Sequence, residues 1–120
     1  MTVKALLDRA DTIFPNVCPF ALKSFWLYEL DKQIYTDFLE PYGIFADPES
    51  EDSSCADREL LIADGFSGVY LYYVFMQLEL MSGNITGYQN QAGLFNRAYM
   101  SFMNFFNRNH TIPSRKIIID

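Results

Sequence analysis

The side chains most able to do chemistry are carboxylates in the middle of the chain. Residues 41–66 hold seven acids and one arginine. The acids are Asp47, Glu49, Glu51, Asp52, Asp57, Glu59 and Asp64. Carboxylates bind Ca²⁺ and Mg²⁺, but the spacing fits an EF-hand loop poorly, because Asp52 stands where the turn needs glycine and Arg58 stands where the last ligand should be glutamate. We therefore interpret residues 43–57 of this segment as a solvated acidic loop and expect no metal site there.

The other reactive side chains lack the partners that catalysis needs. Residues 65–68 (GFSG) do not have the G-x-S-x-G spacing of a nucleophile elbow, and Ser67 suits the N-cap of a following helix better. The single histidine, His110, has no nucleophile or carboxylate beside it. Cys18 and Cys55 are isolated, so we expect reduced thiols and neither zinc nor a disulfide. These patterns predict no catalytic residue, no cofactor and no enzymatic activity.

Length and composition favour one folded domain over residues 1–120. Half of the residues are hydrophobic and 17% are aromatic, enough to form a core. The longest apolar run, 69–76, is well short of the roughly 20 residues of a membrane-spanning helix. The first residues, MTVKALLDRAD, lack the apolar core of a signal peptide, so we expect no membrane contact and a protein that stays in the cytoplasm where it is made. The net charge of −6 and the absence of a basic patch argue against tight nucleic-acid binding.

Apolar periodicity predicts four helices, over residues 2–14, 19–39, 67–82 and 84–109. Thr2 is the expected N-cap of the first helix, and Gly83 fits the left-handed position that ends the third. In the second helix we expect an inward face of five apolar residues, with Lys23 and Asp31 among the charged residues on the other faces. The expected inward residues are Leu22, Trp26 (or Phe25), Leu30, Ile34 and Phe38.

The third and fourth predicted helices differ in their apolar patterns. The third is apolar nearly all round, and so small a subunit cannot easily surround such a helix, so we expect Tyr70, Tyr72 and Tyr73 to contact other subunits or partners. The fourth has a one-sided aromatic stripe that a single subunit can bury as core. Arg97 and Arg108 lie outside this stripe, and we expect them to meet the acidic loop of an adjacent copy.

Two short β-branched or aliphatic runs, 59–62 and 116–119, are the strand candidates, and we expect them to pair. The predicted fold class is therefore mainly α: a small bundle of about four helices, with a helical hairpin in the C-terminal half and a minor two-stranded β element.

Most of the chain outside residues 43–57 resembles the head–tail connector (neck adaptor) proteins of tailed phages. The opening helices are similar in style to those of that family, and residues 69–113 resemble its C-terminal half. The motifs that carry the resemblance are Val69-Tyr70-Leu71-Tyr72-Tyr73, Gly83-Asn84, Tyr88-Gln89-Asn90, Phe95-Asn96 with Tyr99, and Phe105-Phe106-Asn107-Arg108-Asn109-His110 before Pro113.

The resemblance implies a structural subunit of the virion neck, assembled in the cytoplasm of the host bacterium. Such a subunit forms a ring with copies of itself on the phage portal protein, extends the DNA channel and presents a surface to stopper or tail-completion proteins. The acidic loop would then face the channel or a partner through Asp47, Glu49, Glu51, Asp52 and Asp57. The alternative is a small regulatory or inhibitory protein-binding module of phage origin, and a metal-dependent nuclease built on the acidic loop is a third interpretation.

Overall fold

The computed structural model describes residues 1–39, 56–62 and 64–109, and in these ranges the chain is a bundle of four α-helices. They are α1 (Val3–Ile13), α2 (Phe20–Ile34), α3 (Gly68–Met81) and α4 (Ile85–Asn109). A π-helical turn, η1 (Tyr35–Leu39), extends α2, and a 3₁₀ turn, η4 (Asp64–Phe66), precedes α3. The predicted mainly α fold is confirmed.

The helix ends follow local sequence signals. The Thr2 hydroxyl accepts a hydrogen bond of 3.1 Å from the Ala5 N–H and so caps α1. Gly83 has a φ of +78° and reverses the chain between α3 and α4, as predicted. Ser67 occupies the N-cap position of α3, but its side chain makes no capping bond and accepts one from the Arg9 guanidinium instead (3.3 Å).

The predicted inward face of α2 is wrong in part. Leu22 is exposed, whereas Lys23 and Asp31, which were expected to face water, are buried together with Ser24, Leu27, Leu30 and Ile34. Burying an ion is costly unless it is paired, and both ions here have partners on other segments. Lys23 contacts Asp11 on α1, and Asp31 contacts Arg58.

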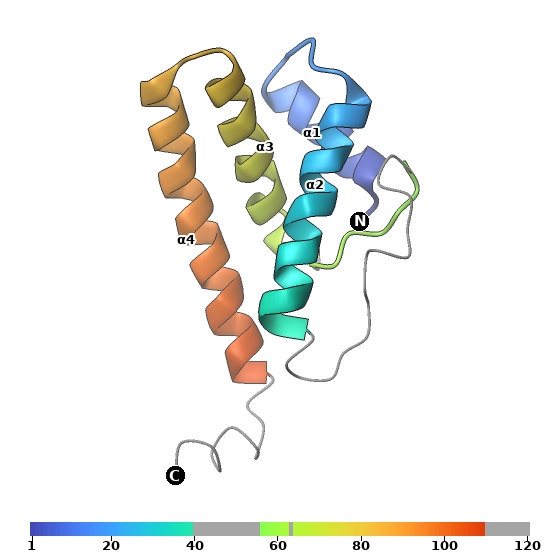
Figure 1. Cartoon of the computed structure of the whole chain (residues 1–120). Helices are drawn as coiled ribbons and strands as arrows, with labels where there is room; N and C mark the ends of the chain where they lie inside the picture. The colour runs from blue at the N-terminus through green and yellow to red at the C-terminus, as the bar shows by residue number, and fades with distance from the viewer. Residues whose placement is uncertain (40–55, 63, 110–120) are drawn as a thin grey trace.

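The expectation that one chain cannot cover α3 is also wrong. Helix α3 runs through the middle of the bundle, with α4 on one side and α1 and α2 on the other (Figure 1). These three helices bury most of its apolar surface, and only its last turn, at Leu80 and Met81, is exposed. The buried residues of α3 are Val69, Tyr70, Leu71, Val74, Phe75, Met76 and Leu78.

Helices α3 and α4 form the predicted hairpin. The aromatic stripe of α4 faces the bundle, with Phe102 and Phe106 buried and Phe95 and Tyr99 packed against the core. Phe102 meets Phe66 edge to face, with ring centroids 5.7 Å apart, so the stripe also holds the turn that leads into α3. The assignment of this stripe to the core is confirmed.

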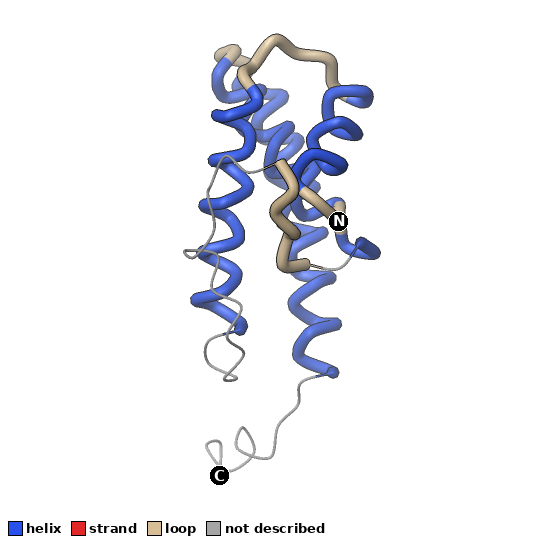
Figure 2. The backbone as a smooth tube through the Cα atoms, turned by 90° about the vertical axis from the view of Figure 1, so that its right-hand side faces the viewer, coloured by secondary structure: helices blue, strands red, loops and turns tan. Residues whose placement is uncertain are grey.

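Residues 56–62, which we call the strap, lie along the start of α1 and do not form a named strand. Val3 N–H donates to the Arg58 carbonyl (2.9 Å) and Leu60 N–H to the Met1 carbonyl (3.0 Å), with one isolated bridge between Thr2 and Glu59. In Figure 2 the strap faces the viewer as a tan tube. The predicted pairing of 59–62 with 116–119 is not seen, since the strap pairs with the N-terminus and residues 116–119 lie outside the described residues.

Candidate interaction site

The tyrosines predicted as contact residues lie inside the bundle. Tyr70 is only 1% exposed, so its assignment to an outer contact surface is wrong. Tyr72 and Tyr73 are half-buried and pack against the core. The ring centroids of Tyr73 and of Phe95 on α4 are 5.5 Å apart. These aromatic rings hold α3 to its neighbours within one subunit. Tyr70 therefore contributes nothing to the external surface, and Tyr72 and Tyr73 contribute only part of their rings.

Tyr70 belongs to a buried polar network that fastens the strap to the helices. Arg58 Nη1 donates to Asp31 Oδ2 at 2.8 Å, and the Tyr70 hydroxyl donates to Asp31 Oδ1 at 2.7 Å. The same hydroxyl accepts a 2.8 Å hydrogen bond from the Ile62 N–H. The network thus joins α2, α3 and both ends of the strap.

Burial sets the protonation behaviour of this network. Burial raises the pKa of Asp31, although the hydrogen bonds from Tyr70 and Arg58 oppose that shift. Burial, reinforced by the Asp31 charge, raises the pKa of Tyr70 well above its ordinary value, so the phenol stays a hydrogen-bond donor. Within the described residues, Arg58 Nε and Nη2 are buried without a hydrogen-bond acceptor, and the guanidinium lies 5.6 Å from the centroid of the Tyr28 ring.

The outer face of α4 is a long polar surface with no acidic residue. Arg97 and Arg108 are exposed there, and their predicted contact with the acidic loop of an adjacent copy stays a prediction. Of the predicted acidic residues, Asp57 is exposed on the strap, and the other four lie outside the described residues. The exposed residues of this face are Gln89, Asn90, Gly93, Asn96, Arg97, Met100, Ser101, Asn104, Phe105 and Arg108.

A second surface lies at the end of the bundle where the α1–α2 and α3–α4 links meet (Figure 1). The sequence has no charged residue from 12 to 22 or from 80 to 96. We call residues 12–20 and 80–86 the uncharged end. Six of its large apolar side chains are exposed, which is unusual for so small an area. They are Ile13, Val17, Phe20, Leu80, Met81 and Ile85.

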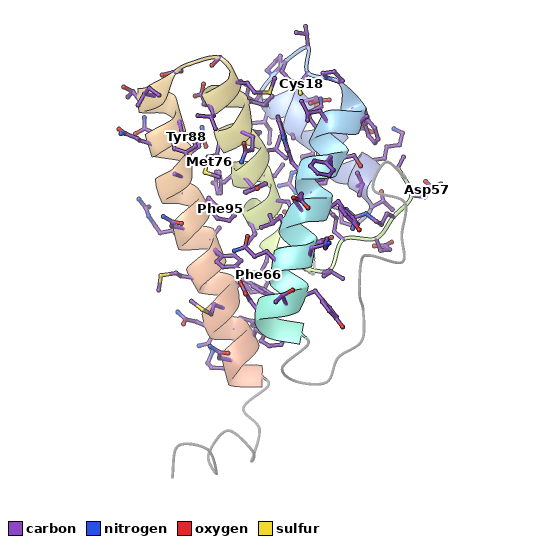
Figure 3. All side chains as sticks on the ribbon, viewed as in Figure 1. Cys18, Asp57, Phe66, Met76, Tyr88 and Phe95 are labelled. Atoms are coloured by element: carbon purple, nitrogen blue, oxygen red, sulfur yellow. The ribbon has the colours of Figure 1, made fainter. Side chains whose placement is uncertain are left out.

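An open pocket of about 300 Å³ lies in the uncharged end, between the α1–α2 link and the last turn of α3. Its lining is mostly apolar. Val17 stands at its rim with its side chain fully exposed (101%), and Figure 3 shows Cys18 at this end of the bundle. The lining residues are Asn16, Val17, Cys18, Pro19, Leu78, Met81 and Ser82.

Polar contacts beneath the pocket fix the shape of the α1–α2 link. Lys23 Nζ lies 2.7 Å from Asp11 Oδ1 and also donates to Asn16 Oδ1 at 3.2 Å. Asn16 Oδ1 in turn accepts the Cys18 N–H at 3.0 Å. The Lys23–Asp11 pair is neutral as a unit, so it leaves the end without net charge. Burial raises the pKa of the Cys18 thiol, which keeps it protonated near neutral pH.

Comparison of the chain with protein-family models, curated proteins and solved structures found no match. The site must therefore be interpreted from its own geometry.

Neither metal ligation nor membrane insertion is indicated by the described part of the chain. Over residues 1–39, 56–62 and 64–109, no group of three or more His, Cys, Asp or Glu side chains is arranged to hold a metal ion. No helix within these same ranges has the length and hydropathy to cross a membrane.

The uncharged end is the surface that sequence reasoning missed. Its two halves belong to different links, which are far apart in the chain and come together only through folding. The two uncharged runs were nevertheless visible in the sequence as a signal.

Proposed function

We propose that the chain is a structural subunit of a phage neck, which forms a ring on the portal protein and joins it to stopper or tail proteins. The family resemblance of the sequence motivates this proposal. The single observation that carries it is the outer face of α4, a continuous surface with exposed amides and arginines and no acid.

The geometry of α4 suits lateral contact between copies. The helix has 25 residues, so it is about 37 Å long at 1.5 Å per residue. It packs on the rest of the subunit mainly through α3, which leaves its opposite side exposed along its length. A straight helical edge of this kind can lie against the next subunit around a ring, with the same pair of surfaces repeated at every contact.

Charge favours a head-to-tail arrangement over a symmetric pair of α4 faces. Helix α4 carries Arg97 and Arg108 and no acid, whereas residues 41–66 carry seven acids and one arginine. Two α4 faces would place arginine against arginine, which costs energy. An α4 face against residues 41–66 of a neighbour would bring opposite charges together, and the contact would then repeat around a closed ring.

The test uses the portal protein encoded by the same genome. The purified chain is mixed with portal rings and examined by sedimentation velocity and negative-stain electron microscopy. We expect the chain to sediment with the portal and to add a ring of density to one end of it. The double variant Gln89→Glu with Arg97→Gln should lower binding at least tenfold, because it takes the net charge of α4 from +2 to zero with little change of shape.

Gln33→Glu is the control for the Gln→Glu part of this change, since Gln33 is an exposed glutamine on α2. It should bind the portal like the unaltered chain. Mass spectrometry of purified virions should detect the chain. If virions lack it and the portal does not bind it, the neck function is wrong, and the regulatory or inhibitory binding module becomes the better interpretation.

A further inference from the structure

We infer that the free protein pairs end to end with a second copy of itself through the uncharged end, as a two-fold symmetric dimer. This inference goes beyond the proposed function, because it concerns a different surface from the α4 face and the state of the protein away from the portal.

The first argument is shape. Val17 projects fully into solvent at the rim of the pocket that its own link helps to form. The pocket has the volume of about ten liquid waters, enough for an aliphatic side chain. A projection and a hollow on one surface are self-complementary, since a two-fold axis between two copies places each Val17 in the pocket of the other.

The second argument is charge, which permits the second copy that the shape argument names as the occupant. Each chain carries a net charge of −6, so two copies repel one another over most orientations. The uncharged end contributes no charged side chain of its own to this repulsion. The Lys23–Asp11 pair beneath it is neutral, and the carboxylate of Glu79 lies against Asn84 and Gly87 of its own hairpin. Glu79 keeps its charge beside this end, but two copies meet there with less repulsion than through the acid-rich residues 41–66.

The third argument is the gain from burial. Met81, which lines the pocket with Val17, is 59% exposed, and Ile85 of the same uncharged end is 58% exposed, so water contacts this apolar surface in the free subunit. Covering apolar surface is favourable by about 25 cal/mol per Å². The patch is nevertheless small beside the roughly 20–30 residues a side of a stable interface. We therefore expect reversible association, with a dissociation constant in about the micromolar to millimolar range.

Sedimentation velocity of the full chain over a range of concentrations tests the dimer. The sedimentation coefficient should rise with concentration toward that of a dimer and no further, because an isologous contact closes on itself. Val17→Glu should raise the dissociation constant at least tenfold, since each copy would have to bury a carboxylate in the mostly apolar pocket of the other. Ile85→Glu should act in the same direction without harming the fold, because an acid is favourable in the first turn of α4.

Met100→Glu is the control: Met100 is 54% exposed on the outer face of α4, away from the uncharged end. It should dimerise like the unaltered chain. The inference is overturned if the chain stays monomeric up to about 1 mM, if it forms species larger than dimers through this end, or if Met100→Glu weakens association as much as Val17→Glu does. A different protein found in the pocket of an otherwise monomeric chain would also overturn it.

Crosslinking gives a second measurement. In a Cys55→Ser background, the remaining thiol is Cys18, which lines the pocket. A short bismaleimide should then link two copies into covalent dimers whose yield rises with protein concentration and falls in the Val17→Glu variant. Failure of the portal test would leave this result untouched, so the two proposals can fail separately.

Discussion

Asp31 and Arg58 show how a charge can be buried without loss of the fold. Both side chains are almost fully buried, and each would be very unfavourable alone. Together with Tyr70 they satisfy both oxygens of the Asp31 carboxylate and fasten the strap to α2 and α3. The stability of the network therefore depends on all of its side chains together. Removing one ion of the Asp31–Arg58 pair should cost more free energy of unfolding than removing both.

Replacing Arg58 with methionine should lower the free energy of unfolding by about 3–5 kcal/mol, because it leaves the Asp31 carboxylate buried without its counter-ion. The double variant Arg58→Met with Asp31→Leu should recover more than half of that loss, since no uncompensated charge remains. Urea denaturation of both variants and of Asp31→Leu completes the double-mutant cycle. A cost below about 1 kcal/mol for Arg58→Met would show that the network does not anchor the strap.

The same residues mark the limit of prediction from sequence at this scale. Lys23 and Asp31 were placed on exposed faces of α2 because charged side chains are rarely buried. Their partners come from other segments, and Arg58 is remote from Asp31 in the chain. No local sequence pattern therefore predicts these ion pairs. The same remoteness hides the role of Tyr70, which looks like one more apolar residue of α3.

At the scale of the elements, helix ends and hairpins follow local rules. Thr2 and Gly83 mark helix ends because a cap or a left-handed turn depends on one residue and its immediate neighbours. The inward face of α4 was also predicted correctly, because its aromatic residues recur at helical spacing. The cover of α3 could not be predicted this way, since it depends on how α1, α2 and α4 pack around one helix.

Two glycines give a test of these rules with opposite signs. Gly83→Ala should destabilise the protein by about 1–2 kcal/mol, because φ is +78° there and a side chain strains that conformation although space is open around it. Gly93→Ala should stabilise it by about 0.5–1 kcal/mol, because Gly93 lies within exposed α4 and a Cβ there also meets open space. Thermal and urea unfolding measure both. Equal effects of the two substitutions would contradict the left-handed turn.

At the scale of the whole molecule, charged and uncharged surfaces are kept apart. The bundle places arginines and amides along the outside of α4 and large apolar side chains at the uncharged end. The outside of α4 suits a contact with a different surface of a neighbour, and the uncharged end suits a contact with the same surface of a second copy. The predicted contacts at Arg97 and Arg108 stay predictions that the α4 variants test. The uncharged end could not be predicted because its two links meet only in the folded chain.

Salt should change the two proposed contacts in opposite directions. Between about 50 and 500 mM NaCl, binding of the α4 face to a neighbour or to the portal should weaken, because salt screens attraction between opposite charges. End-to-end pairing of the free protein should strengthen, because salt screens repulsion between two chains of charge −6 while the apolar contact remains. Sedimentation velocity at both salt concentrations measures each effect. The same direction of change for both would show that one of the two surfaces is wrongly assigned.

The network of Asp31, Arg58 and Tyr70 also has an evolutionary consequence. Because each of the three is costly without the others, descendants of one ancestral chain should keep or lose them together, even where most other positions have drifted. The interval from Asp31 to Arg58 contains the acidic loop and can vary with its length, whereas the interval from Arg58 to Tyr70 is set by the strap and the turn into α3. Distant homologues could therefore be recognised by an arginine that precedes a tyrosine by the interval from Arg58 to Tyr70, together with an aspartate in the preceding helix.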